Sequence, residues 1–444
     1  CERNNGGCFT LPKKEESTMQ KMKYSGVEWI GEIPEDWDIK RLKAVLCERN
    51  ESNNPIKTDY ILSLTNDRGV IPYDEKGDVG NKSKEDLSGY KLAYLNDIVL
   101  NSMNVIIGSV ALSKYYGCVS PVYYMLYPRN PMDDVRYYNY IFQTKEFQSK
   151  LKGYGNGIME IRMRIQMSKL NTVELPIPDA TTQTRIADFL NDKCGKIDRY
   201  IEKQQQTIDK LKEYKQAVIT EAVTKGLNPD VPMKDSGIEW IGMIPEHWDV
   251  PEIKYLVRIA SGGTPDRNHP EYWNGNIPWI KTGELQNDII TNAEEYITEE
   301  GLNNSSAQVF NINTILVAMY GQGKTRGMTA LLKTPASTNQ ACAGLTVTNS
   351  NVQIEYLWQC LIGAYDAIRS EAAGSGQPNL SATLIGNFHI ALPPIEEQGL
   401  IVEYIKDRTV EIKSTIHKAE KLLEKLTEYK KSLIYEAVTG KMEV

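Results

Sequence analysis

Two long stretches of the chain place apolar residues at alternating steps of four and three. One starts at Leu190 and the other at Ile405, and Lys, Glu and Gln fill many of the positions between the apolar ones. Apolar positions that alternate in this way over about five heptads are typical of coiled coils. The pattern therefore predicts two long helices, each with a narrow apolar seam. The aliphatic seam residues are Ile197, Ile201, Ile208, Leu211 and Val218 in the first helix and Ile412, Ile416, Leu423, Leu426 and Leu433 in the second.

Prolines and glycines mark where both helices begin and end. Proline cannot continue a helix backwards, because it lacks the amide hydrogen, and glycine is favoured just after a helix end. At 1.5 Å per residue each helix would be roughly 60 Å long, which exceeds the width of a small domain. Each helix could pack on its own globular domain, but we expect the two seams to bury each other in an antiparallel pair. The marking residues are Pro176, Pro178 and Gly226 for the first helix and Pro393, Pro394 and Gly440 for the second.

The two helices belong to an internal repeat that covers most of the chain. The segments SGVEWIGEIPEDWD at 25–38 and SGIEWIGMIPEHWD at 236–249 are identical at eleven of fourteen positions. A second match joins 183–224, which ends in EYKQAVITEAVT, to 398–439, which ends in EYKKSLIYEAVT. Each half therefore runs from a short Trp/Pro motif through a globular stretch to a proline-rich segment and a long helix.

Within each globular stretch, short apolar runs alternate with polar turns, which is typical of mixed α/β structure. The segment NDIVLNSM at 96–103 aligns with NTILVAMY at 313–320, and both are expected to open a strand–loop–strand passage. The predicted fold class is α+β: two mixed α/β globular domains separated by two long helices that form an antiparallel coiled coil, with a pseudo-twofold internal repeat. We divide the chain into a tail at 1–22, a first globular domain at 23–175, a central helix at 176–226, a second globular domain at 227–390 and a distal helix at 391–444.

Composition narrows the class of protein. The 444 residues are 41% hydrophobic and 25% charged, as in ordinary soluble globular proteins. The net charge of −7 is mild evidence against a protein that grips nucleic acid unaided through a basic face. No apolar run approaches the ~20 residues that cross a bilayer. The seven cysteines form no C-x-x-C pair and lie far from the four histidines, so we expect no zinc or other metal site, no disulfide framework and a cytoplasmic location.

The segment AMYGQGKT at 318–325 differs by one methyl group from a phosphate-binding loop. Gly in place of Ala318 would complete the pattern G-x-x-x-x-G-K-[ST], whose backbone amides and lysine bind nucleotide phosphates. Such a loop needs a helix directly after it, so that the helix N-terminus faces the phosphates. Here Arg326 and Gly327 lead into a short apolar run and a Lys-Thr-Pro turn. We therefore expect a loop between two strands rather than a nucleotide site.

Polar and basic residues gather in and around these strand–loop–strand passages. Asn and Gln pair bidentately with adenine, and Arg or Lys with guanine, each good pair giving about 1–3 kcal/mol of discrimination. Any one of these residues could equally be a solvated loop side chain, but together they predict DNA-reading surfaces. The candidates are Arg68, Lys82, Lys84, Asn101, Ser102 and Asn104 in the first half and Lys281, Thr282, Tyr320, Gln322, Lys324, Thr325, Arg326, Asn339 and Gln340 in the second.

The paired motifs resemble those of the specificity subunit of Type I restriction–modification systems. The resemblance rests on the doubled SGxEWIGxIPExW, on LPIPDATTQ at 175–183 and LPPIEEQ at 392–398, and on GSGQPNLS at 374–381. It covers about residues 23–444. The first half departs from the pattern, because GYGNGIMEIRMR at 153–164 stands where the second half has GSGQPNLS. Contact residues are therefore not transferred from one half to the other.

The resemblance implies a subunit that recognises double-stranded DNA for phage defence, with two target-recognition domains that each read half of a bipartite sequence. It implies that the helices set the spacing and dock two copies of a DNA adenine methylation subunit, which restriction subunits with helicase and nuclease activity join. The chain contains no D/N-P-P-Y/F motif and no glycine-rich cofactor loop, so we expect it to be non-catalytic. S-adenosylmethionine, ATP and magnesium would belong to the other subunits. Two alternatives stay open: a two-headed adaptor for protein or RNA, and a nucleotide-binding protein built on residues 321–325.

Overall fold

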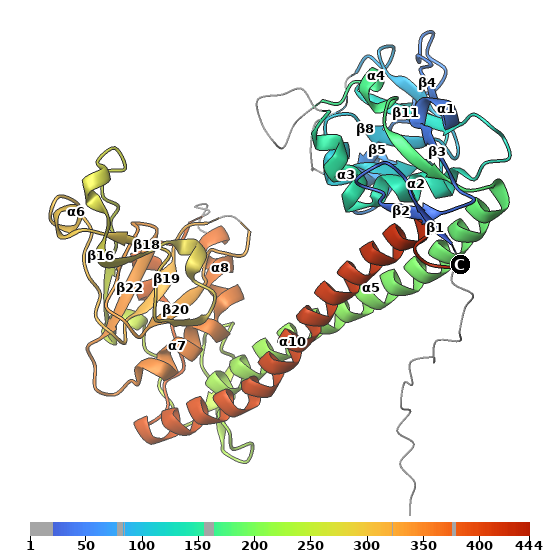
Figure 1. The fold of residues 1–444 in the computed structure, drawn as a ribbon. Coiled ribbons are helices and arrows are strands. Elements are labelled where there is room, and N and C mark those ends of the chain that lie inside the picture. The colour runs from blue at the N-terminus through green and yellow to red at the C-terminus, as the bar shows by residue number, and fades with distance from the viewer. Residues whose placement is uncertain (1–20, 78–82, 84, 155–163, 322, 375–378) are drawn as a thin grey trace, which may run out of the picture. The chain divides into compact units, whose positions relative to one another are not determined.

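The computed structural model describes residues 21–77, 83, 85–154, 164–321, 323–374 and 379–444. The chain forms two compact units. Unit 1 combines the residues up to 204 with 422–444, and unit 2 consists of 205–421. Each unit therefore contains one globular half, the beginning of one long helix and the end of the other (Figure 1).

The central sheet of unit 1 has four antiparallel strands in the order β4-β11-β8-β9. The first three residues of strand β8 are apolar, and both faces of the strand are covered: Ile98 and Leu100 enter the main core, and Val99 enters a smaller core beneath the β5–β6 hairpin. The elements of this half are β1 Met22–Tyr24, β2 Glu32–Pro34, β3 Asp38–Arg41, α1 Leu42–Val45, β4 Leu46–Arg49, β5 Leu62–Thr65, β6 Gly69–Pro72, η1 Tyr73–Lys76, β7 Lys91–Ala93, β8 Ile98–Asn101, η2 Val105–Ile107, β9 Val110–Leu112, β10 Gly117–Val119, β11 Tyr123–Pro128, α2 Val135–Gln143, α3 Lys145–Lys152, α4 Met167–Leu170 and β12 Glu174–Ile177.

The central sheet of unit 2 repeats this order as β15-β22-β19-β20 and adds β17, which pairs with β20 in parallel. Ile315 and Val317 of β19 face one core, and Leu316 faces the other, as in β8. The predicted fold class, with its internal repeat of mixed helix and sheet, is confirmed. The elements are β13 Met233–Asp235, β14 Met243–Pro245, η3 Ile253–Tyr255, β15 Val257–Ser261, η4 Pro270–Tyr272, β16 Trp273–Ile280, η5 Thr282–Glu284, β17 Asp288–Ile290, β18 Glu295–Ile297, α6 Glu299–Asn303, β19 Ile315–Ala318, β20 Thr329–Leu332, β21 Ser337–Thr338, β22 Cys342–Val347, α7 Ile354–Gly363, α8 Tyr365–Gly374 and α9 Ala382–Asn387.

The long helices are α5, Ala180–Lys225, and α10, Ile395–Val438. They run antiparallel in both units: Lys430 Nζ lies 2.6 Å from Asp198 Oδ1 in unit 1, and Lys212 Nζ lies 3.2 Å from Glu420 Oε1 in unit 2. All ten aliphatic seam residues are buried or half-buried, which confirms that the seams bury each other. The outer faces of the two long helices carry charged residues. No helix in the described part of the chain is long and apolar enough to span a membrane.

The repeated Trp/Pro motif forms a hairpin that packs on the end of a long helix. In unit 1 the β1–β2 hairpin and buried Trp37 lie against Gly440, just after α10, and in unit 2 Trp248 lies against Gly226, just after α5. Both glycines have positive φ, +68° and +73°, which glycine adopts without steric cost. The prediction that these two glycines end the helices is confirmed.

Two equivalent tyrosines tie each globular half to the same helix ends. Tyr137 Oη donates to the carbonyl oxygens of Pro176 and Val438, both at 2.9 Å. Tyr356 Oη donates to the carbonyl of Ala391 at 2.8 Å and to that of Val223 at 3.3 Å. The last carbonyls of a helix have no partner within the helix, so these hydroxyls satisfy acceptors that would otherwise be buried and unpaired.

Each proline-rich motif ends in a glutamine, Gln183 or Gln398, whose side chain is buried. Gln183, 1% exposed, donates to the carbonyl of Pro178 at 3.1 Å and accepts from the amide of Asp134 at 3.1 Å. Gln398 is fully buried and accepts from the amide of Gln353 at 2.7 Å. Each glutamine thus joins the first turn of a long helix to the start of the helix that covers the sheet.

Candidate nucleic-acid interface

The two central sheets carry a loop at the same point of their topology. In unit 1 the loop joins β8 to β9, and in unit 2 it joins β19 to β20. Both strand pairs are antiparallel, which confirms the strand–loop–strand prediction in each half. One repeated frame therefore presents two loops that differ in length and composition.

The loop of unit 1 is anchored by apolar burial. Its 3-10 turn η2 places Val105 in the core with no exposed surface and Ile106 with 4%. Gly108 closes the turn with φ of +86°, and a Cβ there would lie 3.3 Å from Gln148 Nε2. The turn is fixed from beneath, so Asn104 at its start lies half-exposed at a defined position.

Beside this loop lies a cleft of about 710 Å³, and three of the residues selected from the sequence line it together. Asn101 ends strand β8, Asn104 lies in the β8–β9 loop, and Arg68 comes from the β5–β6 turn. Arg68 is exposed, and its Nη1 donates to the carbonyl of Glu75 at 2.9 Å, which orients the guanidinium. These three candidates thus bring one guanidinium and two side-chain amides to the cleft, the groups that read guanine and adenine edges.

The same cleft contains polar residues that no sequence motif marked. These residues come from three loops and from strand β11: Asn66, Ser109, Ser120 and Tyr123. Burial raises the pKa of the Tyr123 hydroxyl, so this group stays neutral and can donate a hydrogen bond. The only local sequence signal is the turn-forming Asn66, because the other three reach the cleft through strand pairing.

Three other candidates of the first half do not add to this cleft. Ser102 is fully buried, and its Oγ donates to the carbonyl of Val122 at 2.7 Å. It therefore supports the strand from inside, and we leave it out of the proposed interface. Lys82 and Lys84 lie outside the described residues, as do most residues of the divergent segment at 153–164.

The loop of unit 2, residues 321–327, is followed by strand β20 and not by a helix. Gly321, Gly323 and Gly327 have positive φ of +148°, +59° and +85°. Carbonyl groups of the loop, rather than its amides, meet charged and polar side chains: Arg369 donates to the carbonyls of Arg326 at 2.7 Å and Gly323 at 2.9 Å. The described part of the loop therefore joins two strands, as the sequence predicted.

Four candidates of the second half lie on or next to this loop. Tyr320 is 42% exposed, and Lys324 is exposed without an ion pair to any described residue. Thr325 and Arg326 are half-exposed, and the Nε of Arg326 is buried without a hydrogen-bond partner in the described part of the chain. The loop thus presents one free ammonium group and one incompletely paired guanidinium. Gln322 lies outside the described residues.

The other four candidates form a neighbouring patch where β16 meets β21. The amide of Asn339 donates to the carbonyl of Ile280 at 3.2 Å, which brings Asn339 and Gln340 next to Lys281 and Thr282. The patch adjoins the loop, because the amide of Met319 donates to the carbonyl of Ala341 at 2.8 Å.

Lys281 is less available than the sequence suggested. Its Nζ lies 2.9 Å from Glu294 Oε2 and 3.1 Å from Glu295 Oε1, and these two carboxylates raise its pKa. The Oε1 of Gln340 likewise accepts from Thr264 Oγ1. Lys281 is therefore neutralised within its own domain, and Lys324 is the better candidate for a phosphate or base contact.

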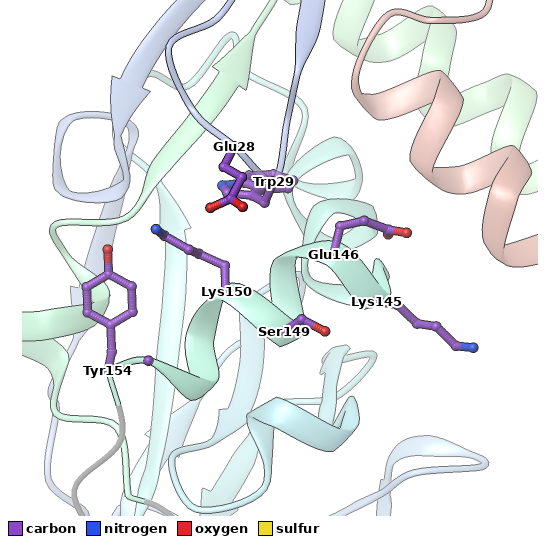
Figure 2. A pocket seen from close by; sticks show the side chains of 8 residues that line it. Glu28, Trp29, Lys145, Glu146, Ser149, Lys150 and Tyr154 are labelled. Carbon is purple, nitrogen blue, oxygen red and sulfur yellow. The ribbon is translucent and has the colours of Figure 1, made fainter.

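A second pocket of unit 1, of about 580 Å³, lies at the Trp/Pro motif rather than at the loops (Figure 2). Glu28 and Trp29 of the motif face residues of α3, including Glu146 and Lys150. The lining mixes carboxylates with ammonium groups, so it has no net charge that would favour a phosphate. This pocket is not part of the candidate DNA surface.

The repeated frame, its two polar loops and the paired long helices together define a two-domain DNA specificity protein. A family model described as "Type I restriction modification DNA specificity domain" matches the chain twice, at residues 34–215 and 245–425. The chain belongs to this family, and the resemblance drawn from the doubled motifs is confirmed. Its function is sequence-specific DNA recognition in a type I restriction–modification system.

Known relatives match this chain over most of its length or over part of it. The specificity subunit of the type I restriction enzyme MjaVIII of Methanocaldococcus jannaschii is 24% identical over 425 residues, which cover 93% of this chain and 94% of that protein. The EcoR124I/EcoR124II specificity subunit of Escherichia coli is 30% identical over 183 residues, 39% of this chain and 45% of that protein. A solved structure described as showing complex assembly and conformational transition of the type I R-M system shares the fold, with a TM-score of 0.68 and 12% identity over 92% of this chain and 99% of that chain.

Proposed function

We propose that each globular half reads one half of a bipartite double-stranded DNA target. The observation that carries this proposal is that equivalent points of one repeated frame bear loops with different polar groups. A repeated frame presents both loops in the same way, and different side chains select different base edges. The reading residues would be Arg68, Asn101 and Asn104 in unit 1 and Tyr320, Gln322, Lys324, Thr325 and Arg326 in unit 2, with Thr282, Asn339 and Gln340 beside them.

We propose further that the α5–α10 pair sets the spacing between the two half-sites. The buried seam supports this role, because seam residues such as Ile208 and Ile412 hold the two helices in one register. An added base pair would turn one half-site relative to the other by about 34–36°, so a fixed helix pair would accept only one spacing. A four-residue insertion in α5 should change the preferred spacing, and an unchanged spacing would refute the role of the helices as a ruler.

Two equivalent tyrosines support docking of two methylation subunits. Tyr214 and Tyr429 occupy the same place in the repeated helix sequences, and each is 57% exposed. Exposed aromatic side chains are enriched at protein interfaces, and a repeat offers the same surface twice. In this proposal the chain is non-catalytic and binds no metal or cofactor. Adenine methylation with S-adenosylmethionine, and cleavage with ATP and magnesium, would belong to the other subunits.

The acidity of the chain predicts how it binds DNA. With a net charge of −7, the chain alone has little excess positive charge with which to release counterions from the phosphate backbone. We expect weak, salt-sensitive binding by the purified chain and tight specific binding only in complex with methylation subunits. Sub-nanomolar specific binding by the chain alone at physiological salt would contradict this.

Methylome sequencing tests the proposal directly. Cells with the gene should carry N6-methyladenine at one bipartite motif, and cells without it should lose that motif alone. In the reconstituted complex, Arg68→Ala should alter selection of one half-site and Lys324→Ala selection of the other. A methylome that is the same with and without the gene, together with binding of the chain to RNA or protein through these loops, would favour the adaptor instead.

A further inference from the structure

The two reading loops are fastened to their frames in different ways. The loop of unit 1 buries Val105 and Ile106. The loop of unit 2 has the sequence GQGKTRG at 321–327, which contains no aliphatic side chain and three glycines. Glycine leaves the backbone free to adopt many conformations, so this loop needs another means of holding one shape.

Two side chains of helix α8 supply that means. Tyr365 Oη donates to the carbonyl of Lys324 at 2.6 Å. The guanidinium of Arg369 donates to two carbonyls: Nη1 lies 2.7 Å from Arg326 O, and Nη2 lies 2.9 Å from Gly323 O. Three carbonyls within four residues are therefore held by donors from one face of one helix.

The helix that carries these donors is itself fixed to the sheet. Ile368, between Tyr365 and Arg369, is 1% exposed and belongs to the main core of unit 2. In the preceding helix α7, Trp358 Nε1 donates to Thr329 Oγ1 of β20 at 2.9 Å. Helices α7 and α8 are thus fixed to the sheet of β20, the strand that follows the loop. We call Tyr365 and Arg369 together the clamp, which therefore rests on the same sheet as the loop.

We propose that Tyr365 and Arg369 are positioning residues that hold the DNA-reading loop of unit 2, and so determine how sharply one half-site is selected. The inference rests on the proposed function of this loop. A guanidinium fork that grips two carbonyls fixes both distance and orientation, which a single flexible ammonium group does not. The clamp leaves the Lys324 side chain exposed, while its carbonyl is occupied.

Unit 1 provides a matched comparison. Helix α3 follows α2 as α8 follows α7, and Gln148 of α3 lies beside Gly108 as Arg369 of α8 lies beside Gly327. Glu146 and Lys150 of α3 lie two residues to either side of Gln148, and they are exposed and half-exposed, respectively. In the described part of unit 1 these two residues give no hydrogen bond to the β8–β9 loop; they line the pocket at Trp29, where Lys150 Nζ lies 5.9 Å from the centre of the Tyr154 ring (Figure 2). Lys150→Gln is therefore a suitable control for Arg369→Gln.

The experiment selects randomised DNA duplexes with the complex of the full chain and its methylation subunits, and sequences the bound fraction. The wild-type complex should select two separate blocks of bases, and Lys324→Ala should identify the block read by unit 2. Arg369→Gln should lower discrimination in that block about tenfold, near the lower end of what one base-reading pair provides. Tyr365→Phe should have a smaller effect in the same block. Arg369→Lys should recover part of the loss, and Lys150→Gln should change neither block.

Hydrogen exchange distinguishes a loosened loop from general damage. The amide of Gly327, which donates to the carbonyl of Ala318 at 2.9 Å, should exchange faster in Arg369→Gln while the amides of β19 and β22 stay protected. Unchanged base discrimination in Arg369→Gln, or an equal loss in both blocks, would refute the role of Tyr365 and Arg369 as positioning residues but leave the proposed function intact. A wild-type complex that selects no bipartite sequence would overturn both.

Discussion

Alanine at three glycines should give three different changes in stability. In Gly440→Ala the new Cβ would lie 2.4 Å from Pro34 Cδ and 3.2 Å from Trp37, and φ is +68°. The left-handed backbone costs about 1–2 kcal/mol for a residue with a Cβ, and overpacking costs typically about 1–3 kcal/mol more. We expect a loss of about 2–5 kcal/mol at this junction of hairpin and helix.

Alanine at Gly226 and at Gly195 separates the backbone penalty from the overpacking penalty. Gly226→Ala has the same backbone penalty at φ of +73°, but its Cβ would approach Trp248 only to 3.0 Å, so we expect a loss of about 1–3 kcal/mol. Gly195 lies within helix α5, and its Cβ would meet nothing within 4 Å. Gly195→Ala should therefore stabilise the chain by about 0.5–1 kcal/mol, because alanine favours the helix.

Hydrogen exchange measured by mass spectrometry suits this series, because the two units can unfold separately and peptides from the β1–β2 and β13–β14 hairpins report on each junction. Urea denaturation gives the effect on the whole chain. The reasoning would be refuted if Gly440→Ala destabilised the protein less than Gly226→Ala does, or if Gly195→Ala were as harmful as either.

Three further predictions follow from single contacts. Tyr137→Phe removes the donor from two buried carbonyls and should lower the free energy of unfolding by about 1–3 kcal/mol, measured by urea denaturation. Lys281→Ala should barely change DNA affinity, because two glutamates neutralise that lysine, whereas Lys324→Ala should lower the salt slope of binding by about one. Burial opposes ionisation of Asp134, but hydrogen bonds and charge from Arg136 outweigh it and lower its pKa. The resulting stability is present above the unfolded pKa near ~3.9 and is lost as pH falls through the folded value, so Asp134→Asn should flatten the acid limb of a stability curve against pH.

The helices were predictable from sequence because their signals are local. Proline stops a helix from starting earlier and a glycine with positive φ ends it, and both effects involve only neighbouring residues. Helix α10 starts at Ile395, directly after Pro394, and ends at Val438, two residues before Gly440. The frame of the globular halves was predictable in part, because the repeat shows the same strand–loop–strand passage twice.

The candidate site was harder to predict, because its geometry depends on contacts between distant residues. Lys281 looked available, but the pairing of β16 with β18 brings Glu294 and Glu295 to its ammonium group. Arg369 had no sequence signal, because it lies 43 residues from its acceptor Arg326 and sits in a helix of ordinary composition. Periodicity shows which face of a helix is buried, but it does not show which backbone lies against that face.

The composition of unit 1 has a consequence for how the protein is made. The hydroxyl of Tyr137 bonds a carbonyl 301 residues further along the chain, and the last turns of α10 complete the core around it. At about 5–20 residues per second, a ribosome needs roughly 15–60 s to supply them. Unit 2, whose residues 205–421 are contiguous, is complete before that. The half that is translated first is therefore the half that finishes folding last, and until then apolar side chains of its core lack the partners that α10 supplies.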